Sequence, residues 1–270
     1  MLRPTRLAFM LMACMPTAAL AGPINTDVAL TPSKGGSVLR LRYTYSESDG
    51  HGNVQHVNTS VWRSTYAFGL KKDLALILSV PYVHREKDVL RPKLGRFERS
   101  DSGFADINFL VKYRFWQDDP RPGETWRWAV IGGLNIRSGD SDFSSDSYDP
   151  ILGTAFTWRR DRQGLFADLV YQFNTGGGEA GHDFLRYDVA YTYRLAPVRY
   201  EPGKAWELNA IAEMNGRYVT DGSNEVFLSP GIQFVTTRWS IETAIQIPVV
   251  QDLAGPETDY KFVVGFRYLW

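Results

Sequence analysis

An alternation of apolar and polar residues along most of the chain is the feature that most limits how this sequence folds. In "GFADINFLVKYRFW" (103–116), Phe109 and Tyr113 share one side of an extended strand, whereas Asn108 and Lys112 share the other. A period of two indicates a strand whose two faces meet different surroundings. Helical spacing of apolar residues at i, i+3 and i+4 is scarce, so the sequence predicts an all-β protein.

Twelve segments carry this strand pattern, some more cleanly than others. They are residues 37–48, 54–70, 73–86, 103–116, 125–138, 149–160, 165–175, 185–195, 205–218, 226–237, 239–250 and 260–270. No composition shift or low-complexity linker divides them, so they form one domain.

The connections between these segments alternate in kind. After each odd-numbered segment comes a stretch rich in Gly, Asp and Ser: 49–53, 87–102, 139–147, 176–182, 220–225 and 252–258. The even-numbered connections include tight turns at 71–73, 160–164 and 236–238 and two longer, Pro-containing stretches at 117–124 and 196–204. Long loops on one side and mostly short turns on the other are typical of outer-membrane barrels, whose turns lie in the periplasm.

Alternation alone does not say whether the apolar face points into a core or out to lipid. A soluble twelve-stranded barrel would enclose an apolar space too wide for side chains to fill. A two-sheet sandwich usually has strands of about five or six residues, whereas a tilted strand needs about nine to eleven to cross a bilayer. Aromatic residues, 14% of the chain, also gather near strand ends, where they would form interfacial girdles. We therefore predict an antiparallel transmembrane up-and-down β-barrel of about twelve strands over residues 37–270.

The N-terminus has the pattern of a secretory signal peptide. Arg3 and Arg6 precede an apolar run, and Ala19-Leu20-Ala21 matches a cleavage site, so residues 1–21 are predicted to be removed. A membrane anchor would need a longer run, and a lipoprotein site at Cys14 is the other alternative. Residues 22–36 are then expected to form an N-terminal periplasmic segment.

The mature chain would contain no cysteine, so disulfides cannot stabilise it in an oxidising compartment. Closure of a barrel would supply that stability, since it pairs every backbone amide. With thirty acidic and thirty basic residues there is no overall field, and nucleic acid is not expected as a ligand.

The polar face of the predicted strands would line the lumen. Its candidate residues are Arg40, Arg42, Asp106, Lys112, Arg114, Arg137, Arg186, Asp188, Glu213, Arg217, Glu242 and Arg267, together with Arg127, Asp168, Arg194, Glu207 and Lys261. They would form either a selective path or a structural network of ion pairs that occludes the interior. Twelve strands lie between side-chain-filled barrels of eight and open porins of sixteen, which favours a narrow or gated passage. The excess of arginine would weakly favour anions.

The last segment, "DYKFVVGFRYLW" (259–270), ends on an aromatic residue with no polar tail. We expect its alternate aromatic side chains to face lipid and to resemble the signal by which the outer-membrane assembly machinery recognises its clients; they are Tyr260, Phe262, Phe266, Tyr268 and Trp270. Besides that machinery, the expected partners are outer-membrane lipid, lipopolysaccharide and a small-molecule solute.

Other candidate sites are weak. The four histidines, His51, His56, His84 and His182, fall in or beside the predicted extracellular loops and show no metal-ligand pattern. The acids of loop 139–149 do not match an EF-hand, so a solvated loop is predicted there. No serine motif accompanies His84, which is unfavourable to a lipid hydrolase. No metal, cofactor or catalytic residue is predicted.

Two stretches resemble the MetA-pathway phenol-degradation family of outer-membrane proteins, which are often described as transporters. One is "YAFGLKKDLALILSVPYV" (66–83), similar to the family's turn between two strands that ends in a Pro-aromatic pair. The other is "GFADINFLVKYRF" (103–115), where Ala105 stands at the position of the family's second Gly. The resemblance implies an outer-membrane channel for small aromatic or other hydrophobic compounds and supplies no binding residues.

We therefore expect passive diffusion of small, hydrophobic or aromatic molecules across the outer membrane of a Gram-negative bacterium. The alternatives are a non-conducting barrel with a structural or adhesive role and, third, an outer-membrane lipid hydrolase.

Overall fold

The computed structural model describes residues 22–50, 54–91, 95–176, 181–199, 205–253 and 255–270. The predicted signal peptide, residues 1–21, lies outside the described residues, as does His51. In the described part of the chain there is no helix long and apolar enough to cross a membrane.

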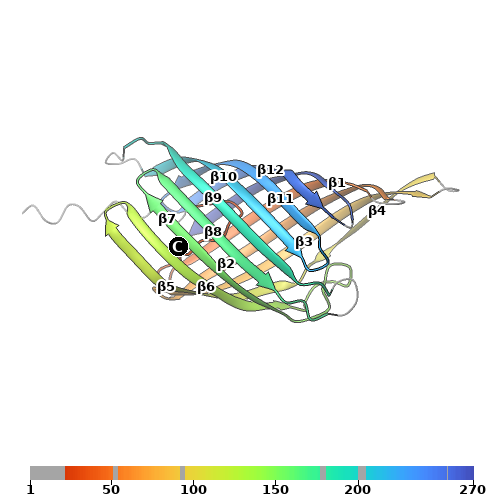
Figure 1. The fold of residues 1–270 in the computed structure, drawn as a ribbon, viewed down its shortest axis with the longest axis horizontal. Coiled ribbons are helices and arrows are strands. Elements are labelled where there is room, and N and C mark those ends of the chain that lie inside the picture. Colours follow the sequence, from red (N-terminus) through yellow and green to blue (C-terminus); the bar gives the residue numbers. More distant parts are fainter. Residues whose placement is uncertain (1–21, 51–53, 92–94, 177–180, 200–204, 254) are drawn as a thin grey trace, which may run out of the picture.

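The described residues form thirteen antiparallel strands (Figure 1). Their bounds are β1 Ser37–Asp49, β2 Val54–Lys71, β3 Leu74–Arg91, β4 Gly95–Phe104, β5 Ile107–Arg121, β6 Glu124–Ile136, β7 Asp149–Arg160, β8 Gln163–Gln172, β9 Phe184–Ala196, β10 Trp206–Val219, β11 Asn224–Thr236, β12 Trp239–Asp252 and β13 Thr258–Leu269.

Strands next to each other in sequence pair, except β4 and β5, which both pair with β3, and β1 pairs with β13, so the sheet closes on itself. β4 and β5 occupy one position in the wall, because both pair with β3 on the same side and follow each other end to end. The result is a closed antiparallel barrel of twelve strands, which confirms the predicted fold class.

The predicted loop at 87–102 is instead mostly strand. β3 continues to Arg91 and β4 begins at Gly95, with the pairs Val89↔Phe97 and Lys87↔Arg99 in register. This β3–β4 hairpin projects beyond the barrel at its loop end (Figure 1). The alternation of apolar and polar residues does not predict this hairpin, because both faces of the projecting strands meet water. The backbone pairing of β3 with β4 nevertheless continues through it.

The Pro-containing stretch at 117–124 is also not a loop. β5 runs to Arg121 and β6 starts at Glu124, so only Pro122 and Gly123 connect them. Gly123 has a φ of 81°, and Pro followed by such a Gly is the signature of a type II turn. The ion pair between Arg121 and Glu124 closes this turn.

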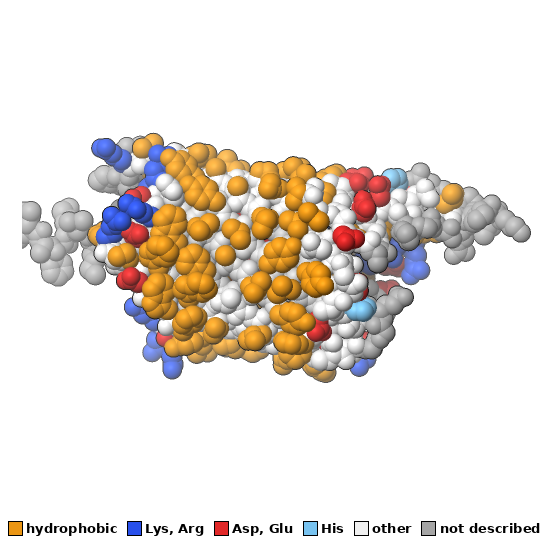
Figure 2. Space-filling view, in the orientation of Figure 1, with side chains coloured by type: hydrophobic (Ala, Val, Ile, Leu, Met, Phe, Trp, Pro, Cys, Tyr) orange, Lys and Arg blue, Asp and Glu red, His pale blue; other side chains and the backbone are white. Residues whose placement is uncertain are grey.

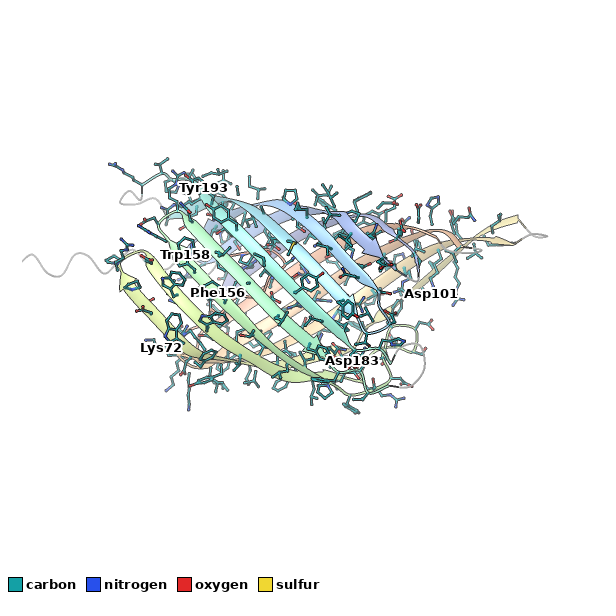
Figure 3. The ribbon with its side chains drawn as sticks, viewed as in Figure 1. Lys72, Asp101, Phe156, Trp158, Asp183 and Tyr193 are labelled. Atoms are coloured by element: carbon teal, nitrogen blue, oxygen red, sulfur yellow. The ribbon has the colours of Figure 1, made fainter. Side chains whose placement is uncertain are left out.

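Most connections at one end of the barrel, the turn end, are two residues long (72–73, 122–123, 161–162 and 237–238), with a longer one at 197–205 as predicted. The longest connections lie at the other end, the loop end (137–148 and 173–183), which also has the connections 220–223 and 253–257. Lys72 lies at the turn end, whereas Asp101 and Asp183 lie toward the loop end (Figure 3). In an outer-membrane barrel the turn end faces the periplasm.

The outer wall carries a broad apolar band between charged ends (Figure 2). Exposed side chains in this band come from strands all around the barrel and include Leu78, Phe109, Val130, Leu152, Leu169, Val189, Met214, Ile232, Ile245 and Val264. Aromatic side chains contact one another near both ends, as in Trp126–Trp158 and Trp206–Phe234 at the turn end and Tyr82–Phe104 at the loop end. This arrangement fits a barrel that crosses a membrane.

The C-terminal strand closes the barrel as predicted. The backbone of Trp270 exchanges hydrogen bonds with Ser37 at 2.9 and 3.1 Å, and its ring lies 5.9 Å from that of Tyr66. Phe262, Phe266 and Tyr268 are exposed on the outer wall.

Deleting Trp270, or adding a charged extension after it, is expected to reduce assembly several-fold, because each change removes an interfacial anchor at the closing seam. The measurement is the heat-modifiable, folded fraction in outer-membrane preparations. Lys261→Arg, a charge-conserving change on the inner face of β13, is the control. Normal insertion of both Trp270 variants would contradict the proposed assembly signal.

Candidate functional site

Residues 22–32, named here the inner segment, lie inside the barrel. Gly22, Ile24 and Ala29 are buried, and the segment contacts side chains from strands on opposite walls. This differs from the predicted periplasmic segment at 22–36. An extended segment has unpaired backbone groups, and polar side chains in the lumen satisfy them here.

The first half of the inner segment is held by the wall formed by β10–β13 and β1. The carboxylate of Glu213 accepts hydrogen bonds from the backbone amides of Ile24, Asn25 and Thr26, at 2.8 Å for Asn25 and 3.3 Å for Thr26. Arg40 donates a hydrogen bond to the carbonyl of Ile24. The Glu213 side chain therefore accepts hydrogen bonds from three successive backbone N–H groups.

The second half of the inner segment reaches the opposite wall. The amide of Asp27 donates to Asp168 at 2.5 Å, and Lys112 Nζ donates to the carbonyl of Val28 at 2.9 Å. The amide of Ala29 then donates to Thr157 Oγ1 at 3.0 Å. The segment thus crosses the lumen from β10 to β5 and β7.

Two small apolar patches on the inner wall receive the segment. In the first patch, Ile24 packs against Ile211, Ala244 and Val263. In the second, Ala29 packs against Ala129, Ile131 and Ala155. Gly231 makes room for Ile24, because a Cβ at this position would lie 2.6 Å from Ile24 Cδ1. Apolar contacts therefore supplement the hydrogen bonds at both ends of the crossing.

The first ionic cluster of the lumen, the Glu242 cluster, holds a buried carboxylate between two arginines. Glu242 is 1% exposed; it contacts Arg40 at 2.5 Å and Arg267 at 2.8 Å, and Gln233 Nε2 donates to it at 2.7 Å. Leaving such a carboxylate unpaired would cost about 3–5 kcal/mol, so the arginines stabilise its charge.

The second cluster, the Arg186 cluster, gathers three carboxylates around one guanidinium. Arg186 lies 2.6 Å from Asp27, 3.3 Å from Asp168 and 3.2 Å from Asp188. Asp27 belongs to the inner segment, so this cluster ties the segment to β8 and β9. The structure thus brings Arg40, Glu242 and Arg267 together, and Arg186 and Asp188 together, as neighbours on the inner face.

The remaining predicted lumen residues occupy varied positions. Arg42 is half-buried, and Arg114 is buried with Nη2 donating to the carbonyl of Lys72 at 2.7 Å. Arg137 lies beyond the end of β6 rather than on a strand; it is exposed and pairs with Asp146 in the following loop at 2.5 Å. The predicted segment 125–138 extends two residues past β6, and loop residues such as Arg137 follow no period of two.

Asp106 anchors that loop to the barrel. It lies between β4 and β5 and accepts hydrogen bonds from the amides of Ser138, Gly139 and Ser145 and from the hydroxyls of Ser144 and Ser145, at 2.7–3.1 Å. The same serine-rich stretch bonds to Asp149. Its serines are therefore bound to Asp106 and Asp149, whereas the acids Asp140, Asp142 and Asp146 of the predicted solvated loop are exposed.

Cations and aromatic rings meet at the loop end of the lumen. Arg217 lies 4.7 Å from the ring centroid of Phe184, and Lys261 Nζ lies 4.0 Å from that of Phe227. In the described part of the chain, no carboxylate forms an ion pair with Arg217 or Lys261. These four residues are named here the mouth group.

A pocket of about 360 Å³ adjoins the mouth group. Its lining includes His182, Arg217, Asp221 and Glu225. The amide of Ser223 donates to Asp221 at 2.8 Å, and this hydrogen bond lowers the pKa of the Asp221 carboxyl. The pocket therefore offers both signs of charge, and Arg217 connects it to the ring of Phe184.

The described histidines show no catalytic or metal-binding arrangement. His84 Nε2 lies 3.2 Å from Glu86 Oε1, with both side chains exposed on β3, and no described serine hydroxyl bonds to the ring. His56 lies 3.8 Å from Asp49. No group of three or more His, Cys, Asp or Glu residues among the described residues could hold a metal ion.

Sequence reasoning missed the inner segment and its apolar contacts. The available signal was a local failure of alternation, where residues on the inner face are apolar too. Ile211 stands between Ala210 and Ala212, and Val263 stands between Phe262 and Val264. Such positions predict that something apolar covers the inner wall.

Sequence comparison matches residues 35–248 to the model of the family described as "Putative MetA-pathway of phenol degradation". No curated protein matches the chain by sequence.

Several solved structures are similar to this chain. The COG4313 outer membrane channel from Pseudomonas putida F1 has a TM-score of 0.63 at 11% identity, covering 92% of this chain and all of that one. The β domain of the Bordetella autotransporter BrkA has 0.49 at 11% identity, covering 88% and 100%. The toluene transporter TodX from Pseudomonas putida has 0.46 at 8% identity, covering 94% and 96%. The first match shares the fold of this chain, and it agrees with a location in the bacterial outer membrane.

Glu213→Gln is expected to loosen the inner segment, because one amide oxygen and an N–H₂ donor would replace two charged acceptors facing three donors. Loss of a charge-assisted hydrogen bond costs about 1.5–3 kcal/mol, so hydrogen exchange in residues 22–30 should accelerate about tenfold or more. The measurement is hydrogen exchange with mass spectrometry. Glu225→Gln, which does not contact the segment, is the control. Equal protection in both variants and the wild type would contradict the anchoring role.

Proposed function

Because the chain belongs to the family described as "Putative MetA-pathway of phenol degradation", we propose that it is a passive outer-membrane channel for small, hydrophobic or aromatic molecules. The match over residues 35–248, from just before β1 into β12, is the observation that carries the proposal. The twelve-stranded barrel supplies the span, and a passive channel requires neither cofactor nor catalytic group.

The mouth group supports an aromatic solute. Phe184 is half-buried and offers part of its ring to a solute, and aromatic rings attract one another at centroid distances of about 4.5–7 Å. Phe227 is 4% exposed beneath Lys261, so it supports that cation rather than contacting the solute. Arg217 and Lys261 add cations that interact with a π-system or with a partial negative charge on a hydroxylated ring. The solute is proposed to meet these residues first, on entry from the loop end.

The inner segment supports a narrow passage rather than an open pore. It crosses the lumen between the Glu242 and Arg186 clusters and is bonded to both walls. A solute is proposed to pass beside the segment or to displace it. Because both walls carry cations and anions, the passage is proposed to select neither cationic nor anionic solutes strongly.

The same network favours the second candidate function, a non-conducting structural or adhesive barrel. Buried ion pairs such as Glu242 with Arg40 and Arg267 stabilise a closed interior without any passage. A transport measurement separates the two functions.

Expression of the protein in Gram-negative cells is expected to raise the initial uptake of a radiolabelled monoaromatic, phenol or toluene, several-fold. Lipopolysaccharide slows such solutes, so the channel would carry the increase. Phe184→Ala should lower this uptake, whereas Phe109→Ala, on the lipid face, should not. Uptake equal to that of vector-only cells, with the folded barrel in the outer membrane, would favour the non-conducting barrel instead.

Removal of residues 22–32 is expected to raise single-channel conductance in planar bilayers several-fold, because the crossing segment no longer narrows the lumen. Heat-modifiable migration of both proteins checks that the barrels are folded. An unchanged conductance would show that the segment does not limit the passage of ions.

A further inference from the structure

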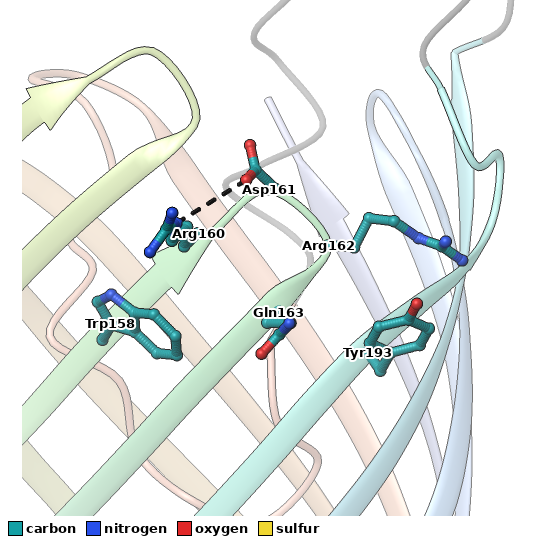
Figure 4. Close-up of a pocket in the computed structure, with 6 residues that line it drawn as sticks. All are labelled: Trp158, Arg160, Asp161, Arg162, Gln163 and Tyr193. Carbon is teal, nitrogen blue, oxygen red and sulfur yellow. Dashed lines mark ion pairs between the residues drawn. The ribbon is translucent and has the colours of Figure 1, made fainter.

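The outer wall carries a polar pocket at the turn end that the transport path does not use. It has a volume of about 320 Å³ and is lined by Trp158, Arg160, Asp161, Arg162, Gln163 and Tyr193 (Figure 4). These residues come from the end of β7, the β7–β8 turn, the start of β8 and the end of β9. Register places Gln163 opposite both Arg160 and Tyr193.

Arg162 is held in place within this pocket. Its Nε donates to the carbonyl of Arg194 at 2.8 Å, and its Nη2 donates to the carbonyl of Leu195 at 3.0 Å. The guanidinium carbon also lies 4.6 Å from the ring centroid of Tyr193. A guanidinium has five N–H donors, so three remain for a ligand on a side chain that is already ordered.

Arg160 supplies a second guanidinium that is more exposed. Its side chain is 49% exposed, and its nearest carboxylate, on Asp161, lies 4.0 Å away and is itself 77% exposed. The carboxylate of Glu124, on the neighbouring strand, is paired with Arg121. The pocket therefore has two guanidinium groups against one loosely associated carboxylate, and a net positive charge.

The pocket opens onto the apolar band of the outer wall. Leu165 and Tyr191, on the barrel side of the pocket, are about two-fifths exposed, at 38% and 41%. Trp158 lies beside Trp126 at 5.8 Å between ring centroids. Tryptophan and tyrosine mark the level of lipid headgroups, with hydrocarbon on one side and water on the other.

We propose that this pocket binds the phosphodiester headgroup of an anionic phospholipid from the periplasmic leaflet. Arginine matches the planar arrangement of phosphate oxygens with paired N–H donors. Leu165 and Tyr191 would contact the first part of the acyl chain. A free phosphate could meet the arginines but would leave this apolar surface unused. The net positive charge selects an anionic headgroup over a zwitterionic one.

The test is native mass spectrometry of the detergent-purified full-length mature barrel, titrated with phosphatidylglycerol, phosphatidylethanolamine or inorganic phosphate. We expect phosphatidylglycerol to bind more tightly than phosphatidylethanolamine, and millimolar phosphate not to displace it. Arg160→Gln/Arg162→Gln should weaken phosphatidylglycerol binding by about tenfold or more, and Arg160→Gln alone, which leaves the bonded Arg162 intact, by a smaller factor.

Two further variants complete the test. Lys71→Gln/Lys72→Gln removes the same charge from two exposed side chains at another turn and should leave binding unchanged. Asp161→Asn should strengthen binding, and Asn tolerates the positive φ of 52° at this position. Equal losses in both double variants, equal binding of the two lipids, or displacement by inorganic phosphate would each overturn the proposed lipid site.

Discussion

The hydrocarbon core of a membrane offers no partner to a backbone N–H or C=O group, and the barrel follows from that constraint. Each unpaired group would cost several kcal/mol, so a chain without spanning helices must close its sheet. The ladder between β1 and β13 performs that closure, from Val38↔Leu269 to Ser48↔Thr258. The apolar outer wall and the aromatic pairs near both ends are consequences of placing a closed sheet in a bilayer.

Closure creates a second problem inside, where charged side chains lose much of their water. Ion pairs compensate for the lost water: Glu242 lies between two arginines, and Arg186 lies among three carboxylates. The inner segment belongs to this solution, because its amides satisfy Glu213 and its Asp27 completes the Arg186 cluster. The lumen is therefore a partly desolvated polar interior, and its charges stabilise one another.

Alternation predicts this fold well because lipid and lumen impose different demands on successive residues. Phe109 and Lys112 could be assigned to opposite faces for that reason. The β3–β4 hairpin was not predictable in this way, since water surrounds both of its faces. The inner segment was hidden for another reason: Ile24 and Glu213 are 189 positions apart, and nothing local in residues 22–32 indicates such a partner. Only the apolar inner-face residues, such as Ile211 and Val263, hinted at a covered wall.

The inner segment leads directly into β1, and β1 forms one side of the seam that β13 closes. The same strand therefore both follows the chain that fills the lumen and forms the seam that closes it. A segment already inside the curving sheet when the seam pairs needs no threading through an end of the finished barrel. Pairing of β13 with β1 thus encloses residues 22–32, so closure of the wall and filling of the interior depend on the same strand.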